Sequence, residues 1–596
     1  MKYMCNIQSV MKNNIVWVVL GIVFVGAFLR LYHFEDWMHY QLDQARDFRV
    51  VHAAMEYGPG ELPLQGPRAA GSFLRLGPLL YYLEYGSALV FGDTPAGSVM
   101  IIALLNILSI GIFYLFVRRF FDAFISCGLT GLWATSLFLI VYSRFGWNPT
   151  LLPFFVLLFA YALLRVNDRN NKHAGWWLVT AAIATAFIVN MHFVAFVTVP
   201  IIAISYLIWT RPRIGFRYWV MAIVAFIFLN VPLIVNDVKT GGENFQEFFA
   251  VVHDRGGNDV ESAHSITDKV IKNTAMHVQY FWLIITGDQR AGLPTLTGID
   301  IKCGYDCRHG MIRGGIALLF CVAGIASFII LYRRKNNCDQ RMFLRLVGLW
   351  SVVLFVVYTP LAYDIAPRFF LLNAPLFFVF VGCIFAVIST KSQKWSHISV
   401  VVIIVIAIGA QSFFVVQYFH GLAHAATDTK LVLSHPDRIL KEKTRVTFVQ
   451  MEDIVDWMEQ KHRENHEPVF VHAQPEYKRA FWERVDVRDI PRAHIPKDLT
   501  PLYRKGNYFI IIRTQSDQSD FLEKFLVGLD IVERKTFGTL TGYYLRARPS
   551  AVTAEEKIFT PKHRDPRFSK GVQPRYLWRQ VFDGCTYNHQ TDLCEK

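Results

Sequence analysis

The feature that most constrains this chain is a series of long apolar runs. A helix that crosses the hydrocarbon core of a membrane needs about 20 mostly apolar residues. Eleven runs of this kind begin near residues 15, 97, 123, 150, 176, 193, 218, 314, 343, 369 and 397. Only 18% of the 596 residues are charged, against roughly 25% in soluble domains. The sequence therefore predicts a polytopic α-helical membrane protein with about eleven transmembrane helices.

Basic residues beside these runs predict the orientation of the chain. Cytoplasmic connections of membrane proteins are enriched in Lys and Arg. With a cytoplasmic N-terminus, every inner connection contains such residues: Lys2 and Lys12; Arg118 and Arg119; Arg165, Arg169 and Lys172; Arg211, Arg213 and Arg217; Arg333, Arg334, Lys335 and Arg341; Lys391 and Lys394. The net charge of +14 thus follows topology, and we expect no nucleic-acid partner, because zinc-finger spacing and RNA-binding motifs are absent from the sequence. An odd helix count places the C-terminal part outside the cytoplasm.

The chain divides into a membrane part and a smaller part beyond it. We expect a transmembrane domain over residues 1–420, with large outer loops at 32–96 and 235–312. Residues 421–550 alternate helix-period stretches (451–460, 477–482, 520–529) with strand-like ones (469–471, 508–512, 541–545), which predicts a small extracytoplasmic α/β domain. Residues 551–596 form a C-terminal tail.

Four cysteines fall on the predicted outer side of the membrane. Cys303 and Cys307 lie four residues apart, and Cys585 and Cys594 lie in the tail. An oxidising compartment favours disulfides at such positions. Metal binding is the alternative, but no His or Cys pair stands nearby at zinc spacing. We therefore expect two disulfides and no metal site.

Chemistry is expected just outside the membrane, in the first outer loop. The spanning runs contain almost no central ionisable residue, whereas a transporter usually needs several. In the loop, Asp43, Arg46 and Asp47 fall on one expected amphipathic helix, where a carboxylate could accept a proton from a hydroxyl. Arg68 and Arg75 could hold a phosphate. Tyr81, Tyr82 and Tyr85 suit an interfacial aromatic belt. The alternative is a solvated loop with ordinary membrane anchors.

Several segments, and the order in which they follow one another along the chain, resemble the polyprenyl-phosphate-sugar-dependent glycosyltransferases of the GT-C fold. This group includes bacterial relatives of protein O-mannosyltransferases and the lipid A aminoarabinose transferase. Asp43-Gln44 corresponds to its acidic motif after the first helix, often Asp-Glu, so the second acid is replaced. The stretch from Arg75 to Tyr82 stands where the family has K-P-P-L-Y-Y. The further matches are Tyr142-Ser143-Arg144, Gly146-Trp147-Asn148-Pro149 (Asn148 replacing an acid), Met191-His192-Phe193, Asn230-Val231-Pro232 and the P-R-F-F-L-L-N-A-P segment from Pro367 to Pro375.

The resemblance implies an inverting sugar transfer from a polyprenyl-phosphate donor to a glycan, lipid or protein acceptor. It places the reaction on the extracytoplasmic side of a bacterial inner (plasma) membrane. Asp43 would act as the base or position the acceptor nucleophile. Arg75 and Arg368 would stabilise the phosphate, and Tyr81 and Tyr82 would border the donor. Arg46, Asp47, Arg144, Asn148 and His192 are secondary candidates. A divalent cation is compatible with this chemistry but not required by it, because polyprenyl phosphate is already a good leaving group.

The sequence leaves simpler roles open for some of these residues. Asn148 precedes a proline and could cap a helix, His192 could be a hydrogen-bonded packing residue, and Arg46 and Asp47 could pair with each other. Other functions stay open as well. These are a transporter or flippase of envelope lipids or glycans, a non-catalytic envelope scaffold, and an oligosaccharide ligase or polymerase that uses a pyrophosphate-linked donor.

Overall fold

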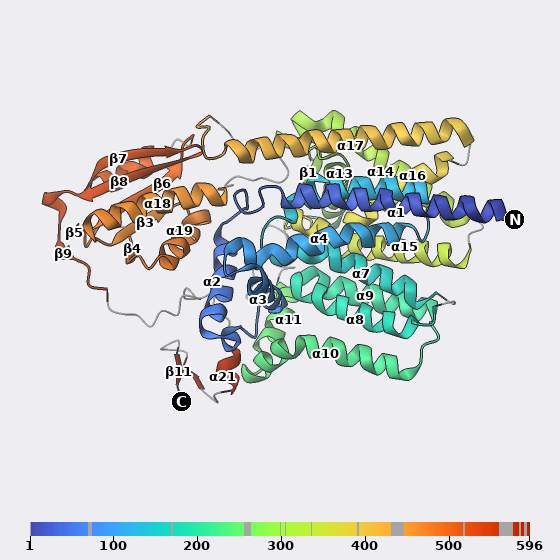
Figure 1. Cartoon of the computed structure of the whole chain (residues 1–596), viewed down its shortest axis with the longest axis horizontal. Helices are drawn as coiled ribbons and strands as arrows, with labels where there is room; N and C mark the ends of the chain where they lie inside the picture. Colours follow the sequence, from blue (N-terminus) through green and yellow to red (C-terminus); the bar gives the residue numbers. More distant parts are fainter. Residues whose placement is uncertain are drawn as a thin grey trace.

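A bundle of long helices carries a mixed sheet beyond one of its ends (Figure 1). The computed structural model describes residues 2–69, 74–168, 171–254, 264–297, 300–303, 305–334, 337–389, 393–430, 446–496, 498–515, 519–559, 576–582, 586–588 and 593–595. Below, the domain-side end of the bundle is the end next to helix α2 (Leu42–Tyr57) and the sheet. The N-terminus lies at the opposite end (Figure 1).

The eleven apolar runs all form helices in the bundle. These are α1 (Lys2–Leu31), α4 (Pro95–Val117), α5 (Ala123–Thr135), α7 (Leu152–Val166), α8 (Ala174–Met191), α9 (Phe193–Thr210), α10 (Phe216–Lys239), α14 (Tyr305–Arg333), α15 (Cys338–Tyr358), α16 (Ala374–Ser389) and α17 (Gln393–His424). Within the described residues, eight helical segments are long and apolar enough to cross a membrane, and the apolar parts of α1, α5 and α16 are shorter. The prediction of a polytopic helical membrane protein is therefore confirmed.

A break at Ser136 explains why α5 is short. Ser136 separates α5 from α6 (Leu137–Tyr142), and its hydroxyl donates to the carbonyl of Ile284, 2.8 Å away. Ile284 belongs to α13 (Ile266–Thr286), which begins with a capping box between Ser265 and Asp268. The second half of this helix, residues 276–286, is apolar but shorter than the eleven runs.

Three of the expected inner connections meet at one end of the bundle. Arg119, after α4, lies 3.5 Å from Asp168, which follows α7, and 3.1 Å from Asp339 at the start of α15. Arg165 also pairs with Asp168, at 2.9 Å. These connections therefore share one side of the bundle, as the distribution of basic residues predicts.

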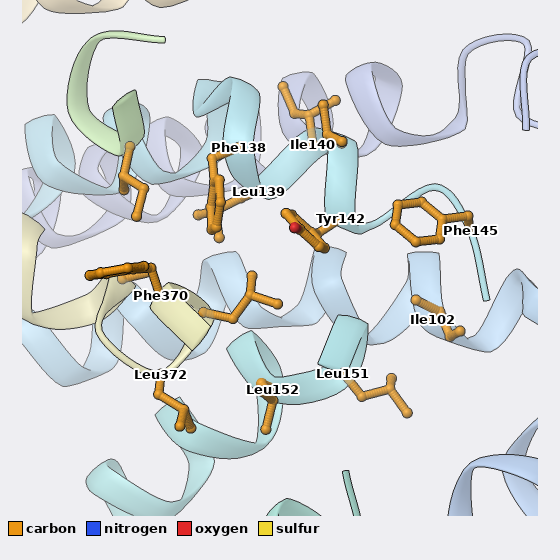
Figure 2. Close-up of a cluster of buried hydrophobic side chains, with 14 of the residues drawn as sticks. Ile102, Phe138, Leu139, Ile140, Tyr142, Phe145, Leu151, Leu152, Phe370 and Leu372 are labelled. Atoms are coloured by element: carbon orange, nitrogen blue, oxygen red, sulfur yellow. The ribbon is translucent and has the colours of Figure 1, made fainter. Parts of the chain in front are cut away.

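A buried apolar cluster fixes two short 3₁₀ helices at the domain-side half of the bundle (Figure 2). They are η2 (Asn148–Leu151) and η4 (Pro367–Leu371), and each has a proline in its first turn. Figure 2 shows Leu151 of η2 and Phe370 of η4 among the same buried side chains as Phe138 and Tyr142 of α6. The cluster thereby holds the backbone on which Asn148 and Arg368 stand.

Arg144 fastens the segment after α6 to the end of α1. Its guanidinium donates to the carbonyls of Arg30 at 2.9 Å, His33 at 3.0 Å and Leu29 at 3.4 Å. The side chain is 1% exposed and also lies over the ring of Phe419. These contacts give Arg144 a structural role.

Replacing Arg144 should therefore destabilise the fold. Arg144→Ala leaves buried carbonyl groups without their donor, at a cost of about 1–3 kcal/mol for each unsatisfied group. We expect a clearly lower midpoint of thermal unfolding in detergent. Arg217→Ala, which removes an exposed arginine at the start of α10, is the control and should leave the midpoint unchanged. Equal midpoints for both variants would contradict this role.

The C-terminal part contains a five-stranded mixed sheet with strand order β4-β3-β6-β8-β7. Its strands are β3 (Val469–Ala473), β4 (Arg492–His494), β6 (Asn507–Arg513), β7 (Leu529–Phe537) and β8 (Leu540–Ala547). Strand β3 is parallel to β4 and β6, while β8 is antiparallel to β6 and β7. The predicted helices are α18 (Phe448–Asn465), α19 (Pro475–Val487) and α20 (Ser519–Leu526). The prediction of a small α/β part is confirmed, but Leu529 begins a strand instead of ending a helix.

Smaller elements complete the description. They are η1 (Pro59–Glu61), α3 (Leu79–Phe91), α11 (Glu243–Asp254), η3 (Thr359–Leu361), η5 (Pro549–Ala551), α21 (Trp578–Phe582), and the strand pairs β1 (Thr295–Thr297) with β2 (Asp300–Lys302), β5 (Tyr503–Lys505) with β9 (Ala554–Glu556), and β10 (Thr586–Asn588) with β11 (Leu593–Glu595). Of these, α3, α11 and α21 gather near α2 at the domain-side end (Figure 1).

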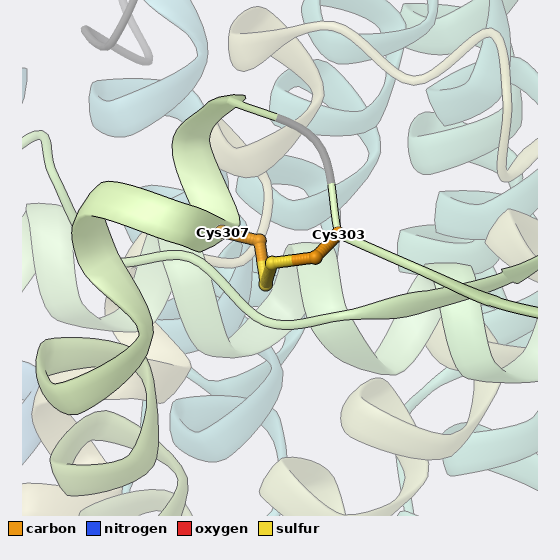
Figure 3. The surroundings of a disulfide bond; sticks show 2 residues. All are labelled: Cys303 and Cys307. Atoms are coloured by element: carbon orange, nitrogen blue, oxygen red, sulfur yellow. A yellow bond between two sulfur atoms is a disulfide. The ribbon is translucent and has the colours of Figure 1, made fainter.

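Cys303 and Cys307 form a disulfide at the start of α14 (Figure 3). Their Cα atoms are 5.2 Å apart, within the range that a disulfide can bridge. The first of the two expected disulfides is therefore present. The pairing of Cys585 with Cys594 lies outside the described residues, because Cys585 is not among them.

The disulfide gives a test of the outer location of this loop. We expect a thiol reagent, applied to the denatured protein without reductant, to leave Cys303 and Cys307 unlabelled. Cys127, a free cysteine, should be labelled under the same conditions and serves as the internal control. Peptide mass spectrometry before and after reduction measures both. Labelling of Cys303 without reduction would contradict an oxidising environment.

Candidate active site at the domain-side end

Helix α2 carries the acidic residues that the sequence singled out. Arg46 lies between two carboxylates: its Nη1 is 2.8 Å from Asp43, and its Nε is 2.7 Å from Asp47. The spacing of three and four residues places Asp43, Arg46 and Asp47 on one side of the helix. The Asp43 side chain is 35% exposed, whereas that of Asp47 is 2% exposed. Asp43 is thus the member of this group that a substrate can reach, and the expected pairing of Arg46 with Asp47 is confirmed.

A small cavity with room for about one water molecule lies behind Asp47. Gln44, Asp47 and Glu84 are among the polar residues that line it. Gln44 donates to the carbonyl of Gly146 at 2.7 Å, so the residue that replaces the family's second acid connects α2 to the segment before η2. Glu84 of α3 is 1% exposed, and neither carboxylate oxygen has a hydrogen-bond partner among the described residues. Sequence reasoning missed Glu84, because it stands within an apolar, aromatic stretch.

Burial changes the ionisation of this group of residues. It raises the pKa of Asp47 to about 6, against the opposing effect of the Arg46 charge. Burial, together with the nearby Asp47 charge, raises the pKa of Glu84 well above its ordinary value. Burial thus favours the protonated form of Glu84, while Asp47 changes charge close to pH 6.

This shift predicts a pH dependence of turnover. Below pH 6 Asp47 becomes protonated and loses its charge–charge attraction to Arg46, the residue that also holds Asp43. We expect turnover at this site to fall about tenfold between pH 7 and pH 5, as one protonation with this pKa requires. Asp47→Asn should remove the transition near pH 6, whatever the residual rate. If Asp47→Asn lost turnover below pH 7 as the wild type does, the transition near pH 6 would belong to another group.

The two predicted tyrosines have different surroundings. Tyr81 is 3% exposed, and its hydroxyl hydrogen-bonds to Asp47. The hydroxyl of Tyr82 donates to the carbonyl of Pro63 at 2.9 Å and accepts from the indole N–H of Trp578 at 2.8 Å. Trp578 belongs to α21, close to the C-terminus, so the end of the chain supports the first outer loop. Tyr81 thus lies within the acidic group, and Tyr82 has a supporting role beside it.

Arg75 lies at the entrance to α3, near the end of α8. Its backbone N–H donates to the side chain of Asn244 at 2.8 Å. Two residues later, a Cβ added at Gly77 would lie 1.4 Å from the amide oxygen of Asn190, in the last turn of α8. Glycine is therefore required at position 77, and the close approach fixes Arg75 beside the domain-side end of α8.

Arg368 reaches the same region from η4. Its guanidinium lies 5.3 Å from the ring centre of Trp147 and 5.4 Å from that of Phe369. The ring of Phe369 in turn contacts His192, which joins α8 to α9, at 4.6 Å. The structure thus brings Arg75 and Arg368 to the domain-side end of α8 from positions almost 300 residues apart in the sequence.

Asn148 does not cap a helix, contrary to one expectation. It starts η2, is 1% exposed, and neither of its side-chain polar atoms has a hydrogen-bond partner in the described structure. His192 is buried among aromatic rings, yet its two ring nitrogens also have no partner there. The expectation of a hydrogen-bonded packing residue is therefore only half right.

The sheet domain docks directly on α2 through α19. The hydroxyl of Tyr40 hydrogen-bonds to Glu483, and Arg49 pairs with Asp486 at 2.7 Å. Arg479, one turn before Glu483, interacts electrostatically with Asp43 and Arg46. The C-terminal domain therefore borders the exposed side of Asp43. The sequence predicts this domain but not its contacts with α2, because contacts across more than 400 residues leave no local signal.

No group of three or more His, Cys, Asp or Glu side chains that could hold a metal ion occurs among the described residues. The acidic side chains near Asp43 include Asp47, which is bound to Arg46 and Tyr81. The arrangement can thus supply a base at Asp43 and cations at Arg75 and Arg368.

Comparisons with known proteins bear on the fold of the chain. Residues 76–235 match the family model described as dolichyl-phosphate-mannose-protein mannosyltransferase. A crystal structure of ArnT from Cupriavidus metallidurans in the apo state superposes with a TM-score of 0.50 and 12% identity, covering 90% of this chain and 98% of that chain. The crystal structure of ArnT from the same organism bound to undecaprenyl phosphate has a TM-score of 0.49 and 14% sequence identity, and it covers the same shares of the two chains. The oligosaccharyltransferase AglB from Archaeoglobus fulgidus, in complex with an inhibitory peptide and a dolichol-phosphate, has a TM-score of 0.46 and 12% sequence identity. The match covers 84% of this chain and 70% of that chain. A search of curated proteins finds no match.

The fold is that of the GT-C membrane glycosyltransferases, and the resemblance inferred from the sequence motifs is confirmed. The matched segment runs from the entrance of α3 to α10 and includes η2, the end of α8 and His192. This evidence favours a glycosyltransferase over a transporter or flippase.

Proposed function

We propose that this chain transfers a sugar from a polyprenyl-phosphate donor to an acceptor, with inversion, on the side of the membrane that carries the C-terminal domain. The observation that carries the proposal is the position of Asp43. This partly exposed carboxylate is held by Arg46, whose side chain is 12% exposed, at the end of the bundle where Arg75 and Arg368 also lie. A lipid-linked donor reaches this end with its chain still in the bilayer.

Each group has a defined task in this reaction. Asp43 accepts the proton of the acceptor hydroxyl as that oxygen attacks the anomeric carbon. Arg75 and Arg368 stabilise the negative charge on the departing polyprenyl phosphate, an electrostatic role that is effective where water is excluded. The C-terminal domain, docked beside Asp43, borders the path of the acceptor, which is a glycan, a lipid or a protein. The cytoplasmic N-terminus and the inner (plasma) membrane location belong to the same proposal.

A donor panel tests the proposal. The purified protein in nanodiscs is incubated with polyprenyl-phosphate sugars that differ in the sugar, with and without crude envelope acceptors. Released polyprenyl phosphate is measured, since slow hydrolysis of a bound donor needs no acceptor. We expect release from one member of the panel. No release and no donor binding across the panel would instead favour a transporter or a scaffold.

A further inference from the structure

Two buried polar side chains at the domain-side end of the bundle have unused hydrogen-bonding capacity. Asn148 is 1% exposed and His192 is 3% exposed. The amide oxygen and nitrogen of Asn148 and both ring nitrogens of His192 have no partner in the described part of the chain. Buried polar atoms are nearly always paired, because an unpaired one destabilises the fold. Two such side chains in one region require an explanation.

The two side chains share their neighbours. Asn148 begins η2, which packs against both η4 and α8. His192 follows the last residue of α8, and its ring lies against Phe369 of η4. Both therefore lie where η2, η4 and α8 converge. Trp147 and Arg368, which are only half-buried, stack on each other beside this junction.

The chemistry of the pair suits uncharged hydroxyl groups. Burial and the nearby Arg368 charge lower the pKa of His192 to about 3, so its imidazole is neutral and has one donor and one acceptor. An amide adds donors and an acceptor. Neither group has the positive charge that would attract a phosphate or a carboxylate. Trp147 adds an aromatic surface on which the apolar face of a sugar ring can rest.

We propose that Asn148 and His192 form the subsite that binds hydroxyl groups of the donor sugar. The inference rests on the proposed function, because it assumes a sugar whose phosphate is held at Arg368. A sugar ring joined to that phosphate lies directly next to Arg368, and η2 and the end of α8 are the neighbouring elements. Rearrangement of the Trp147–Arg368 pair would open the junction to the sugar.

The test compares stability with turnover in Asn148→Leu and His192→Phe. Both changes remove unpaired polar atoms and keep a side chain of comparable shape. We expect an unfolding midpoint equal to or above that of the wild type, and at least a tenfold loss of kcat/KM for the polyprenyl-phosphate sugar that the wild type uses. The wild type should also discriminate against a mono-deoxy analogue of this donor, and one of the variants should lose that discrimination.

Asn236→Leu is the matched control. Asn236 on α10 is likewise 1% exposed, and both of its side-chain polar atoms are unpaired among the described residues. The control should match the variants in stability and keep the wild-type kcat/KM. Retained turnover and donor selectivity in Asn148→Leu and His192→Phe would overturn the subsite while leaving the glycosyltransferase proposal intact. A wild type that turns over no donor at all would overturn both.

Discussion

Asp43→Asn should abolish donor turnover while leaving the fold intact. An asparagine keeps the size of the side chain and can still accept a hydrogen bond from Arg46, which the carboxylate now contacts at 2.8 Å. It cannot accept the proton of an attacking hydroxyl. Loss of a positioned general base lowers kcat about 10²–10⁴-fold. Release of polyprenyl phosphate and formation of glycosylated product measure the effect.

Asp36→Asn is the control for this substitution. Asp36 lies in the same outer loop, and its exposed carboxylate pairs with the nearby His33, at 3.0 Å. This variant should keep wild-type turnover, and both variants should unfold at the wild-type temperature. Substantial turnover by a folded Asp43→Asn protein would remove Asp43 from the reaction and leave Glu84 as the next acid to test.

Loss of Arg368 should have the second largest effect. Its guanidinium lies at the junction of η2, η4 and α8. At this end of the bundle, a fixed cation would stabilise the negative charge of the departing phosphate. Removing one such stabilising group costs about 10²–10³-fold in kcat. We expect Arg368→Gln to lose this much, and Arg368→Lys to recover only part of it, because a lysine lacks the planar two-pronged donor of arginine.

Arg75→Gln provides the comparison within the same proposal. If both cations act on the departing phosphate, each single variant should lower kcat more than it raises KM for the donor. Arg345→Gln is the control. Arg345 on α15 lies over the ring of Trp209 on α9, away from η2 and η4. A change confined to KM in Arg368→Gln would assign Arg368 to ground-state donor binding.

Much of the architecture could be predicted because it follows from local patterns. Apolar length defines the spanning helices, and the basic clusters at Arg119 and Arg165 do meet at one end. Strands β3, β6 and β8 are buried and rich in branched and aromatic residues, which makes them recognisable. Strand β7 was missed because its residues are largely exposed, from Leu529 to Phe537, and have no simple alternation.

The candidate site was predictable only in part, for a physical reason. Asp43, Arg46 and Asp47 are neighbours on one helix, so their pairing is a local property. Glu84 approaches Asp47 only through the packing of α3 on α2, and Arg479 reaches Asp43 only when the C-terminal domain docks. The unpaired state of Asn148 likewise depends on η2 and η4 meeting. No local sequence pattern encodes such contacts.

The most direct test of the central claim is a structure of this protein with polyprenyl phosphate bound in a nanodisc. We predict phosphate density at the domain-side end of α8, within hydrogen-bonding distance of the guanidinium groups of Arg75 or Arg368. The open side of the phosphate should face α2 and Asp43. A lipid phosphate bound elsewhere on the helix bundle, with no ligand density between α2 and η4, would contradict the account.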